Sequence, residues 1–137
     1  MGLILDSSVL VASERLGKNA HQTLSAIAGE IGETDIGISV ISIIELAHGA
    51  ARANSQERKT KRDNFIGELL AVVPIYPVTV PIALRAGLLD GENHARGIRL
   101  ALPDLVIAMT ALELGYGVGT ANLRHFKQVA GLNVVQL

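Results

Sequence analysis

The sequence predicts an α/β fold, a three-layer α/β/α sandwich with a small, mainly parallel sheet. Two observations favour this class. Short apolar runs that suit buried strands alternate with longer segments of helical periodicity. No repeat, low-complexity tract or linker interrupts the 137 residues, so we expect residues 1–137 to form a single domain.

The first half of the chain holds two predicted strands and four predicted helices. The strands are residues 3–5, which end at Asp6, and residues 36–39. Asp6 or Ser7 can cap the first helix, since both side chains accept hydrogen bonds from free backbone amides. The helices, whose apolar residues recur at helical spacing, are expected at residues 7–12, 20–31, 41–53 and 56–70.

The second half holds predicted helices at residues 80–96 and 103–114. Pro103 suits a first helical turn, and Gly115 suits the residue after a helix. The candidate core residues of the first of these helices are Ile82, Leu84, Leu88 and Leu89. Pro74 restricts the third strand to an edge of the sheet or makes it short. The remaining strands are expected at residues 72–75, 116–120 and 134–135.

The composition excludes several classes of protein. Apolar residues make up 49% of the chain, which is too many for a disordered segment. With 12 basic and 13 acidic residues the net charge is −1, so the chain lacks the basic excess of a protein that coats nucleic acid. The absence of cysteine excludes disulfides and thiolate chemistry. No signal peptide or long apolar run is visible, and we expect a cytoplasmic protein without membrane contact.

Three carboxylates stand among apolar residues. Asp6 follows the first strand, Glu45 lies within the apolar stretch 40–47, and Asp104 precedes Leu-Val-Ile-Ala. A buried carboxylate is costly unless it is paired, hydrogen-bonded or bound to a metal. Simpler roles are open for each: Asp6 as a helix cap, Asp104 as a complement to the helix dipole, and Glu45 facing solvent or paired with an arginine.

The predicted topology brings the three acids to one edge of the sheet. Asp6 ends the first strand, Glu45 lies in the helix after the second, and Asp104 begins a helix that runs antiparallel to the strands. Sites in such sheets form at the carboxyl ends of the strands. Clustered carboxylates repel one another unless a cation is present, and hard oxygen ligands favour Mg²⁺ or Mn²⁺. Such an ion suits phosphoryl chemistry.

At these residues the chain resembles the PIN-domain family, in particular the VapC-like ribonuclease toxins of type II toxin–antitoxin systems. The resemblance covers essentially the whole chain. Its four blocks, in order, are LILDSSVLVA around Asp6, SVISIIELAHGA around Glu45, LPDLVIAMTALELG around Asp104, and GVGTANLRHF at residues 117–126.

The resemblance implies a metal-dependent endoribonuclease, a homodimer and a cognate antitoxin that covers the active site. Asp6, Glu45 and Asp104 match the family acids that are proposed as Mg²⁺ ligands and activators of water. Ser7 or Ser8 matches a small hydroxyl position after the first acid, and the resemblance gives Thr120 a supporting role at the end of the late strand.

The chain departs from the family pattern just after this threonine. Many members carry a fourth acid there, whereas this chain has TANLRHF, with no acid between Thr120 and Phe126. Asn122 can still offer a neutral oxygen to a ligand or water. This departure argues against a second metal and favours single-metal catalysis or a weaker metal affinity. A catalytic imidazole is possible only for His125, although a surface position beside Arg124 is the preferred interpretation.

A run of basic residues follows the Glu45 helix. It can be a solvated helix face or a flank that contacts phosphates, and the two interpretations stand about equal. Its members are Arg52, Arg58, Lys59, Lys61 and Arg62. Apolar residues of the early helices form either core or a groove for an antitoxin helix, and the sequence does not separate these. They are Val9, Leu10, Val11, Leu24, Ile27 and Ile44.

Two other functions compete with the ribonuclease. The missing fourth acid motivates a catalytically weakened PIN-like module that binds RNA or protein. An aspartate-based phosphotransfer protein would use Asp6 as its nucleophile, but the D-x-D pattern of such enzymes is absent, since Ser7 and Ser8 follow Asp6.

Overall fold

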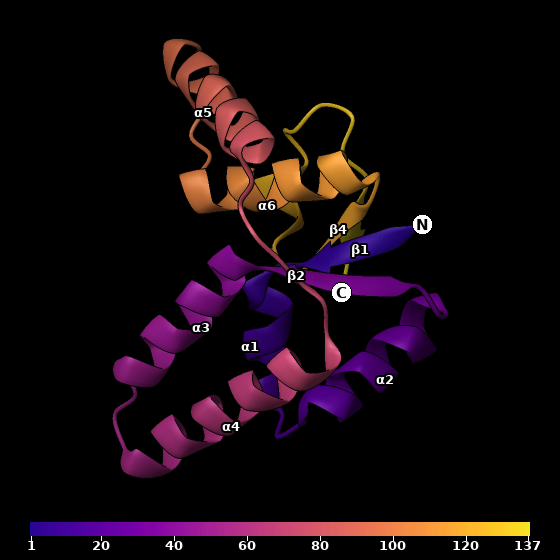
Figure 1. The fold of residues 1–137 in the computed structure, drawn as a ribbon, viewed down its shortest axis with the longest axis vertical. Helices are drawn as coiled ribbons and strands as arrows, with labels where there is room; N and C mark the ends of the chain where they lie inside the picture. The colour runs from indigo at the N-terminus through magenta and orange to yellow at the C-terminus, as the bar shows by residue number, and fades with distance from the viewer.

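Five parallel strands form the centre of the molecule. The computed structural model describes residues 1–137, and its sheet has the strand order β3-β2-β1-β4-β5 (Figure 1). The central strand β1 is buried along its whole length, as expected for a strand covered on both faces. The strands are β1 (Gly2–Leu5), β2 (Asp35–Ser39), β3 (Ile75–Tyr76), β4 (Gly117–Thr120) and β5 (Val134–Gln136).

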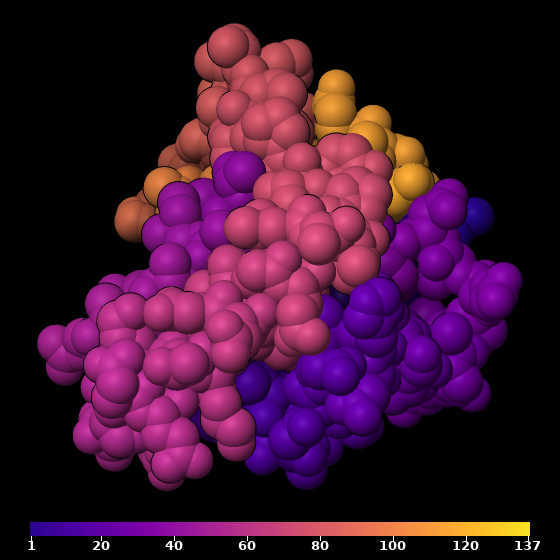
Figure 2. Space-filling view, turned by 60° about the horizontal axis from the view of Figure 1, so that its bottom comes forward, coloured from indigo at the N-terminus to yellow at the C-terminus, as the bar shows by residue number.

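Helices cover both faces of the sheet and complete the predicted three layers. The helices α1–α4 lie on one face, and α5 and α6 lie on the other (Figure 1). In the space-filling view α4 lies across the N-terminal helices, drawn in indigo (Figure 2). The helices are α1 (Ser7–Arg15), α2 (Ala20–Ile31), α3 (Val40–Ala51), α4 (Gln56–Val72), α5 (Val80–Ala95), α6 (Leu102–Leu114) and α7 (Leu123–Phe126).

Each layer of helices has its own core, and β1 contributes to both. Ile4 packs with Val118 and Phe126 on the α5–α6 side, while Leu5 packs with Ile38 and other buried residues of the α1–α4 side. Successive strand residues point to opposite faces, so two neighbouring apolar residues serve two cores. The double burial explains the apolar run at the start of the chain.

Local signals set most helix boundaries. Asn19 and Gln22 form a reciprocal capping box at the start of α2. Thr79 caps α5 through the amide of Ile82. Gly115 ends α6 with φ = 70°, a left-handed conformation that glycine adopts without steric cost. These ends lie within one or two residues of the predicted ones.

Three elements differ from expectation. The strand expected at residues 72–75 is displaced, because α4 continues to Val72 and β3 holds only Ile75–Tyr76. It is short and lies at an edge of the sheet, as Pro74 predicts. The first helix runs to Arg15 rather than ending at residue 12. The short helix α7 was not expected, because four residues carry too little periodicity to indicate one.

The structure also separates core residues from exposed ones. Ile82 is buried, whereas Leu84 and Leu88, predicted for the core, are exposed on the outer side of α5. Among the early apolar residues Val9, Leu10 and Ile27 are core, Val11 and Leu24 are partly buried, and Ile44 is exposed. No helix is long and apolar enough to cross a membrane.

Candidate active site

Strand register places Asp6 beside Thr120. Leu5 pairs with Gly119 of β4, and the amide of Asp6 donates to the Gly119 carbonyl at 2.9 Å, so the next residue of each strand is adjacent. Gly117 fits this strand because a Cβ there would lie 2.7 Å from the backbone oxygen of Asn133. The carboxyl ends of β1 and β4 thus form the floor of the site.

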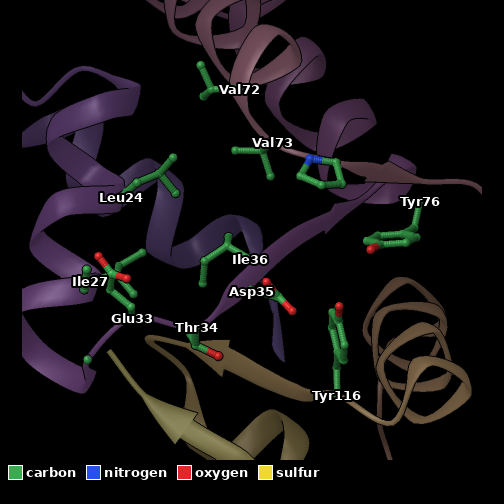
Figure 3. Close-up of a pocket in the computed structure, with 13 residues that line it drawn as sticks. Leu24, Ile27, Glu33, Thr34, Asp35, Ile36, Val72, Val73, Tyr76 and Tyr116 are labelled. Atoms are coloured by element: carbon green, nitrogen blue, oxygen red, sulfur yellow. The ribbon is translucent and has the colours of Figure 1, made fainter. Parts of the chain in front are cut away.

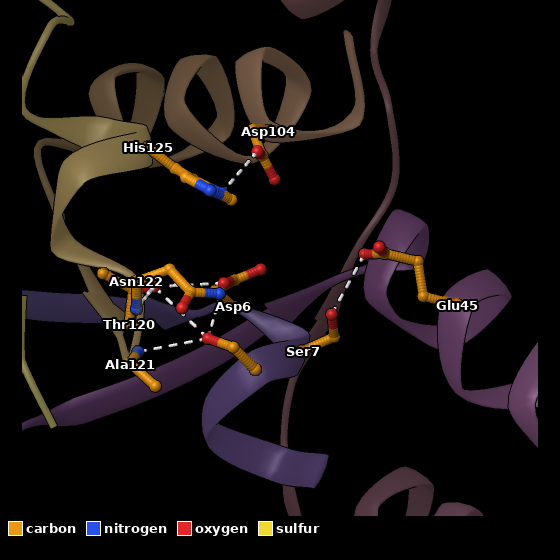
Figure 4. Close-up of polar contacts among 9 residues, drawn as sticks. Asp6, Ser7, Glu45, Asp104, Thr120, Ala121, Asn122 and His125 are labelled. Atoms are coloured by element: carbon orange, nitrogen blue, oxygen red, sulfur yellow. Dashed lines mark hydrogen bonds and ion pairs between the residues drawn. The ribbon is translucent and has the colours of Figure 1, made fainter. Parts of the chain in front are cut away.

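Hydroxyl groups hold the Asp6 carboxylate. Its Oδ2 accepts hydrogen bonds from Ser8 Oγ at 2.7 Å and Thr120 Oγ1 at 3.0 Å (Figure 4). Backbone amides fix both hydroxyls, with Ala121 donating to Ser8 Oγ and Asn122 to Thr120 Oγ1. Asp6 stands at the N-cap position of α1 but makes no side-chain capping bond. The cap interpretation therefore does not explain this buried carboxylate.

Asp104 faces the site from the first turn of α6. The helix begins with Pro103 in its first turn, and no side chain caps it. Asp104 Oδ2 lies 3.3 Å from Nδ1 of His125, which α7 presents from the opposite wall (Figure 4). The imidazole is 56% exposed and the aspartate side chain 16%, so the pair forms one rim of the site.

Glu45 reaches the site from the second turn of α3. Ser39 ends β2 and caps this helix by accepting from the amide of Ile41 at 3.1 Å, which aims α3 away from the strand ends. Ser7 Oγ donates to Glu45 Oε1 at 3.2 Å and links the start of α1 to α3 (Figure 4). Glu45 is exposed at the surface and has no arginine partner.

The three carboxylates influence one another electrostatically. Burial raises the pKa of Glu45, the hydrogen bond from Ser7 lowers it, and the charges of Asp6 and Asp104 raise it further. Burial also raises the pKa of Asp104, and the charge of Asp6 adds to this effect, while His125 opposes it. Three anionic groups thus meet at one edge with a single imidazole as their counter-charge.

The carboxylate oxygens suit a hard divalent cation, but the side chains lie too far apart to surround one. Carboxylate oxygens are the ligands that Mg²⁺ and Mn²⁺ prefer. In the present arrangement no three histidine, aspartate or glutamate side chains lie close enough together to hold a metal ion. Mg²⁺ commonly keeps several waters and binds one or two carboxylates together with substrate phosphates, so a closed cage is not required.

The family model of the PIN domain matches residues 3–132. The chain belongs to the PIN domain family. Among curated relatives, Ribonuclease VapC1 of Rickettsia felis is 30% identical over 135 residues, which cover 98% of this chain and 96% of the relative. Ribonuclease VapC10 of Mycobacterium tuberculosis is 32% identical over 124 residues, covering 90% of this chain and 85% of the relative.

Solved structures share the whole fold with this PIN domain. The VapBC2 complex of Rickettsia felis, bound to a DNA fragment from its promoter, contains a chain with TM-score 0.78 and 21% identity, covering 100% of this chain and 99% of that one. A chain of DNA-bound VapBC from Salmonella typhimurium gives TM-score 0.77 at 21% identity, with coverages of 99% and 98%. At this identity the likeness concerns the fold.

The late block of this PIN domain holds the site residue that sequence reasoning undervalued. His125 was preferred as a surface residue, and it is exposed, but it also lies against Asp104. Its place in the TANLRHF block was the available signal. Asn122 contributes its backbone amide to Thr120, and its side chain forms no hydrogen bond within the protein.

The basic residues after Glu45 divide into two groups. Lys59 pairs with Asp63 at 2.7 Å on the outer side of α4. The others line a cavity of about 610 Å³ between the ends of α1 and α3 and the start of α4, which we call the basic pocket. Its lining residues are Glu14, Arg15, Gly49, Arg52, Ala53, Asn54, Arg58, Lys61 and Arg62.

Another cavity, of about 540 Å³, opens at the opposite edge of the sheet (Figure 3). It lies at the amino end of β2, where Asp35 and Ile36 line it together with Tyr76 and Tyr116. None of the three clustered carboxylates reaches it. The candidate active site is therefore the shallow acidic edge of Figure 4 rather than this more apolar cavity.

Proposed function

We propose that this PIN domain is a Mg²⁺- or Mn²⁺-dependent endoribonuclease and the toxin of a toxin–antitoxin pair. The observation that carries the proposal is the meeting of Asp6, Glu45 and Asp104 at one sheet edge, where each pair repels. The names of the relatives, Ribonuclease VapC1 and VapC10, support the substrate class. The whole chain, residues 1–137, acts as one unit in the cytoplasm.

Asp6, Asp104 and Glu45 would hold the ion, some of them through its waters, and hydrogen bonds fix the Asp6 carboxylate for this role. Once bound, such an ion supplies neutralising charge for the phosphate and lowers the pKa of water. Ser8 and Thr120 bond only Oδ2 of Asp6, so Oδ1 remains free for a ligand. Ser7 keeps the Glu45 side chain turned toward the site.

The raised pKa values of Glu45 and Asp104 suit proton transfer. In hydrolysis a water oxygen attacks phosphorus and gives a proton to a base, while the bond to the leaving ribose oxygen breaks and that oxygen takes up a proton from an acid or from solvent. A carboxylate whose pKa lies nearer the working pH is a better proton carrier. Glu45 is exposed and has room to accept that proton, while His125 restrains Asp104.

The test compares matched aspartate variants with purified protein and single-stranded RNA. Asp6→Asn and Asp104→Asn should abolish cleavage in Mn²⁺ while keeping the fold, and EDTA should stop the wild type. Asp90→Asn is the control, because Asp90 pairs with His94 on α5 outside the acidic edge. Wild-type rates in both site variants would contradict the mechanism.

A PIN-like module without catalysis is the second candidate. The observations that favour it are the open arrangement of the acids and the absence of an acid between Thr120 and Phe126. Calorimetric titration with Mn²⁺ separates the two. Binding that is lost in Asp6→Asn supports the enzyme, and no binding by the wild type supports the module.

Two protein partners complete the proposal. An antitoxin is supported by the structural neighbours, which are VapBC complexes. A homodimer is supported by three exposed apolar residues one turn apart on α5, namely Val80, Leu84 and Leu88. Copurification with the product of an adjacent reading frame, and loss of ribonuclease activity in that complex, test the antitoxin.

A further inference from the structure

The basic pocket carries positive charge that the protein itself does not neutralise. Arg62 is used internally, because its Nε lies 2.8 Å from Glu14 Oε2 and its Nη1 donates to the Leu46 carbonyl at 3.2 Å. Both side chains of this ion pair are largely buried, with 14% and 17% exposed. Arg15, Arg52, Arg58 and Lys61 also line the pocket, and none of them has a carboxylate within ion-pair distance.

Helix dipoles explain only part of this cluster. Arg15 ends α1 and Arg52 is the C-cap of α3, and cations are favourable at those ends. Arg58 lies in the first turn of α4, where the dipole disfavours a cation, and Lys61 follows one turn later. Like charges gathered around one cavity repel, so a bound anion would stabilise them.

The basic pocket and the acidic edge lie along one face of α3. Glu45, Gly49 and Arg52 follow one another on one face of α3, at spacings of four and three residues. On α1, Ser7 and Glu14 share a face in the same way, and Ser7 donates a hydrogen bond from α1 to Glu45 of α3. From Glu45 to Arg52 the helix rises about 10 Å, at about 1.5 Å per residue.

A separation of about 10 Å is within reach of a few nucleotides of one RNA strand, since even the stacked nucleotides of a duplex advance about 3.4 Å each. No aromatic residue lines the pocket, which leaves the phosphates rather than the bases as the groups to recognise. Ala53 is its only hydrophobic lining residue, whereas a docked protein helix needs an apolar groove.

We propose that the basic pocket binds the phosphate backbone of single-stranded RNA within a few nucleotides of the bond cleaved at the acidic edge. This inference rests on the proposed function for the identity of the ligand. Backbone contacts of this kind add affinity and fix the register of the strand without selecting its sequence. Arg62 and Glu14 shape the pocket, and the four unpaired cations bind.

Binding in EDTA tests the inference without requiring catalysis. The probes are fluorescein-labelled oligouridylates of twelve and two nucleotides, followed by anisotropy over a range of salt concentrations. Lys61→Gln and Arg52→Gln should each weaken binding of the longer probe by roughly threefold to tenfold and lower the salt slope by about 0.7. The dinucleotide offers a single backbone phosphate to these cations, so it should bind far more weakly than the longer probe.

Lys59→Gln is the matched control, because it removes the same charge from the same helix outside the pocket. Equal losses in Lys59→Gln and Lys61→Gln would overturn the inference and indicate general electrostatics. The inference would also be overturned if Lys61→Gln and Arg52→Gln still bound RNA but no longer bound a labelled oligoglutamate peptide. That result would favour an acidic protein segment as the ligand. Melting curves check the fold, and Lys61→Gln decides the matter if Arg52→Gln unfolds.

Cleavage in Mn²⁺ is measured separately, so the two proposals can fail independently. RNA binding that depends on the basic pocket, without any cleavage, contradicts the proposed enzyme and supports the pocket. Cleavage by a protein whose Lys59 and Lys61 variants bind RNA equally well contradicts the pocket and supports the enzyme.

Discussion

Thr120 Oγ1 lies 3.0 Å from Asp6 Oδ2, and this hydrogen bond joins the carboxyl ends of β4 and β1. The same threonine oxygen accepts the amide of Asn122 at 2.9 Å, so the backbone orients the hydroxyl toward the carboxylate. Both residues are buried. The contact therefore links strand pairing directly to the geometry of the most enclosed acid.

Replacing Thr120 by valine keeps the shape and removes the hydroxyl. We expect the free energy of unfolding to fall by about 1.5–3 kcal/mol, because a buried carboxylate loses a donor. Cleavage should fall about 10- to 100-fold, the usual range for groups that orient ligands. Thr120→Ser is the control and should retain most of both. Chemical denaturation and single-turnover cleavage measure the two effects, and an unchanged cleavage rate in the valine variant would contradict this role.

Asp104→Asn should stabilise the metal-free protein while abolishing cleavage. Burial and the charge of Asp6 raise the pKa of Asp104 above its ordinary value of 3.8, so ionisation is disfavoured in the folded state. The folded state then holds more protons than the unfolded state at pH values just above 3.8. Stability from this group is therefore present at lower pH and is lost as pH rises through the raised pKa.

The stability difference between Asp104→Asn and the wild type should grow as pH rises above 3.8 and then level off. Melting curves in EDTA from pH 3.5 to about 7 measure it. Adding Mn²⁺ should raise the Tm of the wild type and not that of the variant, since binding to the folded state stabilises it. A variant that is less stable than the wild type at neutral pH would refute this account.

The three acids could be found from the sequence because each stands among apolar residues. Burying a charge is costly, so a carboxylate in such a stretch indicates a specific role. Asp6 follows a run buried on both faces, and Asp104, in the first turn of α6, directly precedes seven consecutive buried residues. The order of strands and helices was likewise predictable, since parallel sheets require this alternation. Boundaries next to Pro74 were not, because a short apolar run there suits the end of a helix as well as a strand.

Contacts between segments far apart in the chain could not be predicted from the sequence. The 3.3 Å approach of His125 to Asp104 depends on how α7 follows β4, which no local pattern encodes. The division of the basic run depends on which side of α4 each residue occupies, with Lys59 facing Asp63 and Lys61 facing the cavity. Lys59 lies on the same helix as Arg58, Lys61 and Arg62, so the sequence pattern alone does not separate them.

His125→Ala should raise the pKa of Asp104 further. The imidazole lowers that pKa by its charge and by a hydrogen bond, and alanine removes both effects. Carboxyl carbon NMR titration of the metal-free protein measures the change, with His94→Ala as the control, since His94 contacts Asp90 instead. A downward shift of the Asp104 pKa in His125→Ala, or equal shifts in both variants, would contradict the assignment.

The exposed face of α5 should mediate self-association. Val80, Leu84 and Leu88 recur every four residues with 72%, 62% and 68% of their surface exposed, which forms a continuous apolar stripe. Burying a leucine contributes about 1.5–3 kcal/mol, so each change to glutamate should weaken a dimer by about tenfold to a hundredfold or more.

Sedimentation velocity of Leu84→Glu and Leu88→Glu should show monomers at concentrations where the wild type is dimeric. Leu70→Glu, at an exposed leucine of α4, is the control and should remain dimeric. A wild type that sediments as a monomer, or variants that stay dimeric, would exclude this face as the interface.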